Sequence, residues 1–251
     1  MSEAFAWAVA LGVAGAIAGS FVAALVVRWP QGRSVTRGRS ACDMCGRTLG
    51  AADLVPLLSA IASRGRCRHC GSVIDPVHAG IETATMLVAA AAGWVAPGWS
   101  GIAGALFGTL LVALAFLDWR AFWLPDRLVA TLAAAGIAVG LAGVDPAPVD
   151  RLIGGGLGFA LLWIVARGYR RWRGRDGMGG GDPKLFGAIG LWLGWRSLPA
   201  VLVVAGLIGL GIVAWRWSRG RAMAADEALP FGSLLAMAAY PTWLMMIGMH
   251  P

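Results

Sequence analysis

Long apolar runs separated by short polar segments dominate this chain, and they predict an all-α protein. A helix needs roughly 20 apolar residues to cross the hydrocarbon core of a bilayer, and most of the runs approach that length. The sixth run is short for a complete span. We therefore expect a polytopic membrane protein with about eight transmembrane helices, at residues 4–27, 79–96, 100–117, 127–143, 151–168, 183–194, 198–215 and 231–249.

The composition agrees with a membrane protein and argues against a soluble one. Hydrophobic residues make up 58% of the chain and charged residues only 14%, whereas a soluble domain carries about 25% charged residues. The first apolar run lacks a basic segment before it and is long for the core of a signal peptide. We expect a retained transmembrane helix there, with a cleaved signal as the alternative.

The basic residues are grouped between the apolar runs, which is a topology signal rather than a nucleic-acid-binding pattern. If the amino terminus lies outside, every Lys and Arg except Arg151 and Arg196 falls on the cytoplasmic side. The opposite orientation would reverse this bias. We therefore expect both termini outside, contact with membrane lipid and no nucleic-acid partner, despite the net charge of +8.

One polar segment is much longer than the others and divides the chain into three parts. Residues 1–27 form the first predicted helix and residues 79–251 hold the remaining seven. Residues 28–78 lie between them and are expected to form a small cytoplasmic domain.

All four cysteines lie in that small domain, in two C-x-x-C motifs that are each followed by glycine. Two thiolates three positions apart in a tight turn reach the same metal, and four cysteines complete a tetrahedral structural zinc site. Disulfides and free thiols are the alternatives, and disulfides are rare in the cytoplasm. His69 is an alternative ligand. The sequence predicts zinc at Cys42, Cys45, Cys67 and Cys70.

Two aspartates at the cytoplasmic ends of apolar runs are candidates for acid–base chemistry. Asp118 ends the third run and Asp182 opens the sixth, after a glycine-rich segment. Acidic residues beside the hydrocarbon region are costly and often functional. Two carboxyl groups that meet share one proton, so one activates water while the other polarises a carbonyl, as in aspartyl proteases.

Structural roles for these residues are also open on the sequence alone. Asp182 precedes Pro183 and therefore fits a helix start. Asp118 lies two residues before Arg120 and fits an interfacial ion pair with it. Asp126 is a third candidate carboxylate and also fits a helix start.

Taken together, these motifs resemble the type IV prepilin peptidase family, also called leader peptidase/N-methyltransferase, along nearly the whole chain. Besides the two cysteine motifs, the matching segments are GSF at 19–21, RWP at 28–30, DLVPL at 53–57, the segment 118–126 that ends in LPD, GMGGGDPKL at 177–185 and PFG at 230–232.

The resemblance implies that Asp118 and Asp182 are the two catalytic aspartates. It implies a multi-pass protein of the bacterial inner membrane that cleaves type IV prepilins or pseudopilins after a glycine, at the cytoplasmic face. It further implies methylation of the new amino terminus by S-adenosylmethionine. The chain departs from the family at residues 22–24 and 77–79, in the half that the family links to methylation.

Two other functions compete with this hypothesis. The first is a non-catalytic membrane assembly factor with a structural zinc site, which would not require both aspartates. The second is a proton-coupled transporter, which predicts acidic residues near the middle of the spans. Asp118 and Asp182 lie at span ends instead, which favours the peptidase.

Overall fold

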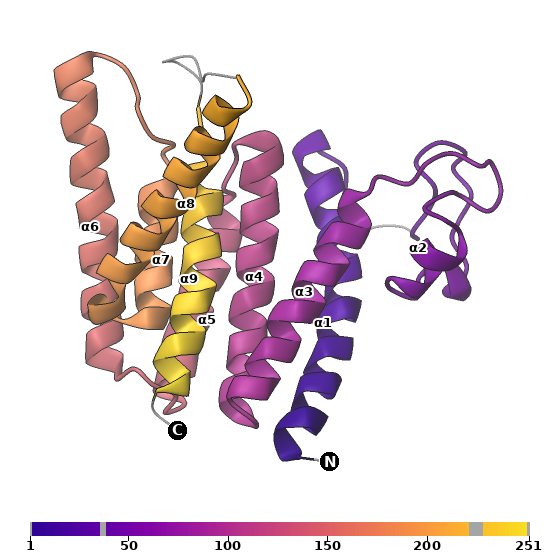
Figure 1. Cartoon of the computed structure of the whole chain (residues 1–251), viewed down its shortest axis with the longest axis horizontal. Helices are drawn as coiled ribbons and strands as arrows, with labels where there is room; N and C mark the ends of the chain where they lie inside the picture. The colour runs from indigo at the N-terminus through magenta and orange to yellow at the C-terminus, as the bar shows by residue number, and fades with distance from the viewer. Residues whose placement is uncertain (1, 36–38, 221–227, 250–251) are drawn as a thin grey trace. The chain divides into compact units, whose positions relative to one another are not determined.

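The computed structural model describes residues 2–35, 39–220 and 228–249. Within those ranges the regular secondary structure is helical, apart from the isolated β-bridges Ala41↔Thr48 and Arg66↔Val73. The chain forms two compact units, Met1–Ala113 and Leu114–Pro251. The prediction of an all-α fold is confirmed (Figure 1).

The first unit is built on two long helices, α1 (Glu3–Arg28) and α3 (Val77–Val95), which pack side by side (Figure 1). Glycines let the two backbones approach closely, as is common between membrane helices. A Cβ atom on Gly15 would lie 2.5 Å from the carbonyl oxygen of Thr85. The segment between the two helices carries three short elements: η1 (Trp29–Gln31), η2 (Ala51–Asp53) and α2 (Leu58–Ala62).

The second unit has a buried central helix, α7. Ten of its twelve residues are buried, and it packs against α5, α6 and α9. Apart from Asp182 and Lys184 the helix has no charged residues, and a largely apolar helix is expected at such a central position. The unit comprises the carboxyl-terminal end of α4 (Trp99–Ala121), α5 (Asp126–Leu141), α6 (Pro148–Arg173), α7 (Asp182–Leu193), η3 (Trp195–Ser197), α8 (Leu198–Ser218) and α9 (Phe231–Gly248).

Glycines also bring α6 and α7 into backbone contact. A Cβ atom on Gly190 would lie 2.2 Å from the carbonyl oxygen of Gly154, and one on Gly154 would lie 2.6 Å from the carbonyl oxygen of Gly190. Neither position tolerates a side chain without separating the helices. This contact fixes the central helix that begins with Asp182.

Arg151, near the start of α6, is 2% exposed and binds main-chain carbonyl groups. Its guanidinium group donates hydrogen bonds of 2.8–3.1 Å that join the end of α5, the α5–α6 connection and the end of α7. A positive charge is favourable beside the carbonyl ends of helices. The five acceptors are the carbonyl oxygens of Gly136, Val144, Asp145, Pro146 and Leu191.

Each of the eight predicted apolar runs corresponds to one of the long helices, α1 or α3 to α9. The largest boundary difference is in α6, which continues to Arg173 through a segment that was expected to be a loop. Arginine is a good helix former, and the helix stops only where Gly174 adopts a left-handed conformation.

Five helical segments of the described chain are long and apolar enough to cross a membrane. This makes the chain a multi-pass membrane protein and supports the predicted eight spans only in part. Helix α7, with twelve residues, is only about 18 Å long at 1.5 Å per residue. The five segments are Glu3–Gln31, Trp99–Ala121, Pro148–Arg173, Trp195–Ser218 and Phe231–Gly248.

Candidate active site and cysteine cluster

Asp118 lies near the carboxyl-terminal end of α4 and is held by the first turn of α9. Its Oδ2 atom accepts a hydrogen bond of 2.7 Å from the backbone N–H of Ser233. The hydroxyl oxygen of Ser233 lies 3.2 Å from the same atom. An anion is favourable at this end of a helix, where the N–H groups are unpaired. Asp118 is only 5% exposed, so it is not an ordinary interfacial residue.

Asp182 is the first residue of α7 and is 4% exposed. Its Oδ2 atom accepts a hydrogen bond of 3.0 Å from the backbone N–H of Gly179. Pro183 follows in the first turn, where a missing N–H costs nothing. The helix start predicted from the Asp–Pro pair is therefore present, with Gly181 rather than Asp182 in the capping position.

Gly232 lies between the two carboxyl groups. A Cβ atom at this position would lie 3.1 Å from Oδ2 of Asp118 and 3.1 Å from Oδ1 of Asp182. The two oxygens are therefore no further apart than twice that distance, close enough for one water molecule to lie between them. The fold thus brings together two buried carboxyl groups that are far apart in the sequence.

Leu124 forms an apolar wall beside this pair. Its Cδ1 atom lies 2.8 Å from the position of a Cβ on Gly232, and its own Cβ lies 2.7 Å from that of a Cβ on Gly181. The sequence analysis did not assign a role to Leu124, Gly232 or Ser233. Leu124 lies in the LPD segment and Gly232 in the PFG segment. These matches to the family were the signal in the sequence that could have identified the two residues.

We expect Gly232→Ala to lower peptide cleavage by about 10²-fold, the order of loss that a small misplacement of reacting groups produces. The new methyl group would enter the space between Asp118 and Asp182. Cleavage rates and thermal unfolding in detergent would be compared with those of Gly156→Ala. A Cβ at Gly156 meets nothing within 4 Å. If Gly232→Ala were as active as Gly156→Ala, the substrate would not react in the space between Asp118 and Asp182.

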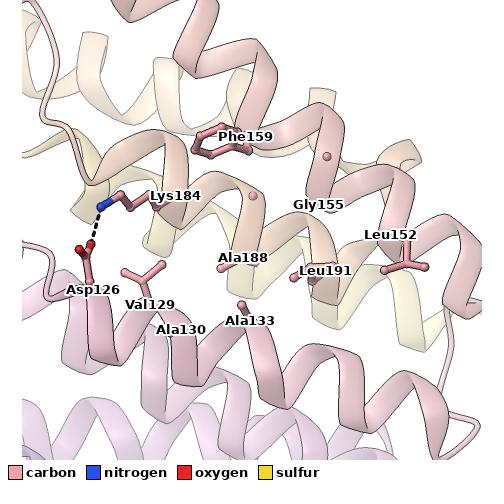
Figure 2. A pocket seen from close by; sticks show the side chains of 12 residues that line it. Asp126, Val129, Ala130, Ala133, Leu152, Gly155, Phe159, Lys184, Ala188 and Leu191 are labelled. Atoms are coloured by element: carbon pink, nitrogen blue, oxygen red, sulfur yellow. Dashed lines mark hydrogen bonds and ion pairs between the residues drawn. The ribbon is translucent and has the colours of Figure 1, made fainter.

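A groove of about 560 Å³ lies between α5, α6 and α7 (Figure 2). Small and apolar side chains line it, and the ion pair between Asp126 and Lys184, at 2.7 Å, lies at one end. Lys184, Ala188 and Leu191 face the groove, and by helix periodicity Asp182 points to the opposite side of α7. Asp126 therefore belongs to a different surface from Asp118 and Asp182.

The four cysteines of the first unit form one cluster. Their sulfur atoms all lie within 4.8 Å of one another, as ligands of a single metal ion would. The cluster can therefore hold a metal through Cys42, Cys45, Cys67 and Cys70.

Both C-x-x-C motifs fold into the same tight turn. Gly46 donates its N–H to the carbonyl of Cys42, and Gly71 donates to the carbonyl of Cys67, each at 2.9 Å. Gly46 and Gly71 have φ values of 70° and 72°, a conformation that favours glycine. The glycines after the motifs thus permit the turns that direct the sulfur atoms toward one point.

The local electrostatics differ among the thiols of the cluster. Hydrogen bonds from the backbone N–H groups of Cys45 and Met44 lower the pKa of the Cys42 thiol to about 6. The backbone of Arg47 acts in the lowering direction on Cys45, yet desolvation and the neighbouring thiols raise the pKa of Cys45 to about 11. A bound cation would offset this repulsion between thiolates.

His69 lies within the second motif but binds elsewhere. Its Nδ1 atom accepts a hydrogen bond of 2.8 Å from the guanidinium group of Arg47. The described metal-ligand group consists of the four cysteines without His69. This arrangement disfavours the alternative in which His69 replaces a cysteine.

We expect the purified chain to contain one zinc ion, and Cys42→Ser to lose it, because a missing thiolate opens the site. Metal content would be measured by atomic emission, and protease sensitivity of residues 39–75 would be followed after chelation. Chelation should expose this segment, since metal binding stabilises such folds. Met44→Ser is the matched control because Met44 is exposed between two ligands. Zinc retained by Cys42→Ser would contradict the prediction.

Two family models match the chain. Residues 13–96 match the bacterial peptidase A24 N-terminal domain. Residues 105–214 match the type IV leader peptidase family. The first match contains all four cysteines and the second contains Asp118 and Asp182. No solved structure matches the chain.

Similar proteins carry the name prepilin leader peptidase/N-methyltransferase. The one from Burkholderia pseudomallei is 42% identical over 208 residues, which cover 81% of this chain and 66% of the relative. The chain thus spans slightly less than two thirds of that relative. The Aeromonas hydrophila protein is 36% identical, over 80% of this chain and 70% of its own length. The Pectobacterium carotovorum protein is 31% identical, over 92% and 90%. The chain therefore belongs to the type IV leader peptidase family.

Proposed function

We propose that this chain is an intramembrane aspartyl endopeptidase that removes the leader from type IV prepilins or pseudopilins. The observation that carries the proposal is the convergence of Asp118 and Asp182 on the space beside Gly232. The names of the relatives support the substrate class. Cleavage after a glycine is the specificity that the family resemblance implies.

Asp118 and Asp182 have complementary roles in the proposed mechanism. The ionised carboxylate takes a proton from a water molecule, whose oxygen attacks the scissile carbonyl carbon. The protonated carboxylic acid donates its proton to the carbonyl oxygen. Collapse of the resulting intermediate breaks the C–N bond, and the amine leaves with a proton from the dyad. Burial of both groups keeps other water away and strengthens their electrostatic effect.

The proposed orientation places this chemistry at the cytoplasmic face of the inner membrane. With eight spans and both termini outside, the end of α4 and the start of α7 face the cytoplasm, together with most basic residues. One of the two basic residues that do not fit this orientation has a structural role instead. Arg151, an exception to the charge bias, is buried against carbonyl groups and is not an exposed topology signal.

The proposal also includes a structural metal site and a second enzymatic activity. The four cysteines are proposed to hold a structural zinc ion, which would stabilise the segment around them, and no step of the cleavage depends on it. The chain is also proposed to methylate the new amino terminus with S-adenosylmethionine, as the names of its relatives indicate for those proteins.

Reconstitution of the purified chain with a full-length prepilin in lipid vesicles tests the proposal. We expect a shortened product whose new amino terminus follows the leader glycine, and methyl transfer to it when S-adenosylmethionine is added. Vesicles without the chain are the control. Absence of cleavage across several prepilins and pseudopilins would contradict the peptidase function and favour a non-catalytic assembly role.

A further inference from the structure

We propose that Ser233 is a positioning residue for Asp118, and that its hydroxyl group supports this carboxyl group in both protonation states. The inference rests on the proposed function, because it concerns the role of Asp118 in proton transfer. It goes beyond that function by assigning a task to a residue outside the two aspartates.

The contacts of Ser233 carry the inference. The residue is 2% exposed and lies in the first turn of α9. Its backbone N–H donates to Oδ2 of Asp118 at 2.7 Å. Its hydroxyl oxygen lies 3.2 Å from the same Oδ2 atom and 2.8 Å from the carbonyl oxygen of Ala115. The hydroxyl thus lies between two acceptor atoms of α4.

A serine hydroxyl has one hydrogen atom and two lone pairs. When Asp118 is ionised, the hydroxyl of Ser233 can donate its hydrogen to Oδ2. When Oδ2 is protonated, the acid can donate to the hydroxyl oxygen, while the hydroxyl hydrogen turns to the carbonyl of Ala115. The two states differ in the rotation of one O–H bond, so no heavy atom has to move.

This property matters because a carboxyl dyad holds one proton that changes position during turnover. A backbone N–H can only donate, so it stabilises an acceptor oxygen and cannot accept a proton from it. The hydroxyl of Ser233 can do both. It therefore keeps Oδ2 of Asp118 hydrogen-bonded, in one orientation, before and after each proton transfer.

Removal of the hydroxyl is expected to slow the chemical step rather than weaken substrate binding. We expect Ser233→Ala to lower kcat about tenfold, the effect of losing one hydrogen bond in the transition state, with KM within about twofold of the native value. Ser233→Thr retains a hydroxyl group at the same position and should restore most of kcat. Alanine and threonine leave the backbone hydrogen bond to Asp118 in place.

The test uses the full chain in vesicles with a full-length prepilin, and measures kcat, KM and thermal unfolding for each variant. Thr242→Ala is the matched control, because it also removes a hydroxyl from α9, one that donates to the carbonyl of Ala238 at 2.8 Å. Its kcat should equal that of the native chain. A tenfold loss in Ser233→Ala, recovered in Ser233→Thr, would support the proposal.

A native kcat in Ser233→Ala would overturn the proposal, and so would a Ser233→Thr chain as slow as Ser233→Ala. If Ser233→Ala unfolds, Ser233→Cys replaces it. A thiol is larger than the hydroxyl group but is a weak hydrogen-bonding group, so a native kcat there would also overturn the proposal. A native chain that fails to cleave contradicts the proposed peptidase function, and the role of Ser233 falls with it.

Discussion

Asp118→Asn and Asp182→Asn are each expected to reduce prepilin cleavage by about 10³-fold or more. An amide neither takes a proton from water nor donates one as an acid, so either change removes one half of the acid–base chemistry. Asparagine has the size of aspartate and keeps an oxygen for the hydrogen bonds from Ser233 and Gly179. The folded state should therefore persist, and initial rates in vesicles should be compared with thermal unfolding.

A third carboxylate provides the control for this prediction. Asp126 is exposed and pairs with Lys184, and an exposed ion pair contributes little to stability. Asp126→Asn should therefore cleave at nearly the native rate. Cleavage retained by Asp118→Asn or Asp182→Asn would show that the assigned pair is wrong. Loss in Asp126→Asn alone would move the catalytic role to that residue.

The double variant sharpens the same experiment. Residues that act as one catalytic unit have non-additive effects, because removal of either already stops the shared step. We expect the chain that carries both Asp118→Asn and Asp182→Asn to be no slower than either single variant. Independent, additive losses would indicate that the two carboxyl groups act in separate steps.

Arg151→Leu is expected to have the largest effect on stability. The change leaves five carbonyl groups without this donor, two of them in buried and three in partly buried hydrogen bonds, and an unsatisfied buried polar group costs about 1–3 kcal/mol. Leucine also cannot link the end of α5 to the end of α7. We expect little monodisperse protein in detergent, measured by size-exclusion chromatography and by the yield from membranes.

Two further variants give this prediction its controls. Arg151→Lys keeps the charge but has three donor hydrogens in place of five, so it should fold with an intermediate unfolding temperature. Arg196→Leu removes the other basic residue that lies outside the predicted cytoplasmic segments. Arg196 is exposed and lies 3.7 Å from Asp150, so its loss should be mild. Native-like stability of Arg151→Leu would show that other groups satisfy the carbonyls.

The cysteine cluster shows how far local spacing can lead. Cys42 and Cys45 are three positions apart, and the glycine that follows adopts the conformation that the turn requires. These features are encoded within the five residues 42–46, so the sequence predicts them directly. The two motifs come together through the fold of residues 39–75, which places the four sulfur atoms within 4.8 Å of one another.

The position of the helices was likewise predictable. A bilayer favours long apolar helices, so the eight apolar runs identify the positions of α1 and α3 to α9 without tertiary information. The same reasoning misplaced the end of α6. Basic residues concentrate in cytoplasmic segments, and this rule holds whether a run of arginines forms a loop or extends a helix.

Asp118 and Asp182 could also be identified from the sequence as candidate acids, because acidic residues at the ends of apolar runs are rare and costly. The sequence did not predict that the two carboxyl groups lie close together. Their proximity depends on α9, which begins about 50 residues after Asp182 and brings Gly232 between the two carboxyl groups. A glycine contributes only the absence of a side chain, so the sequence carried no physical sign of its role.

The amino-acid sequence thus determined the helices, the membrane environment, the cysteine turns and the two candidate acids, since each depends on neighbouring residues or on the bilayer. The tertiary structure decided which distant groups meet. It placed Ser233 on Asp118 and Arg151 on the carbonyls of α5 and α7. Hydrogen bonds between helices depend on packing in three dimensions, and packing is set by all the side chains of the unit together.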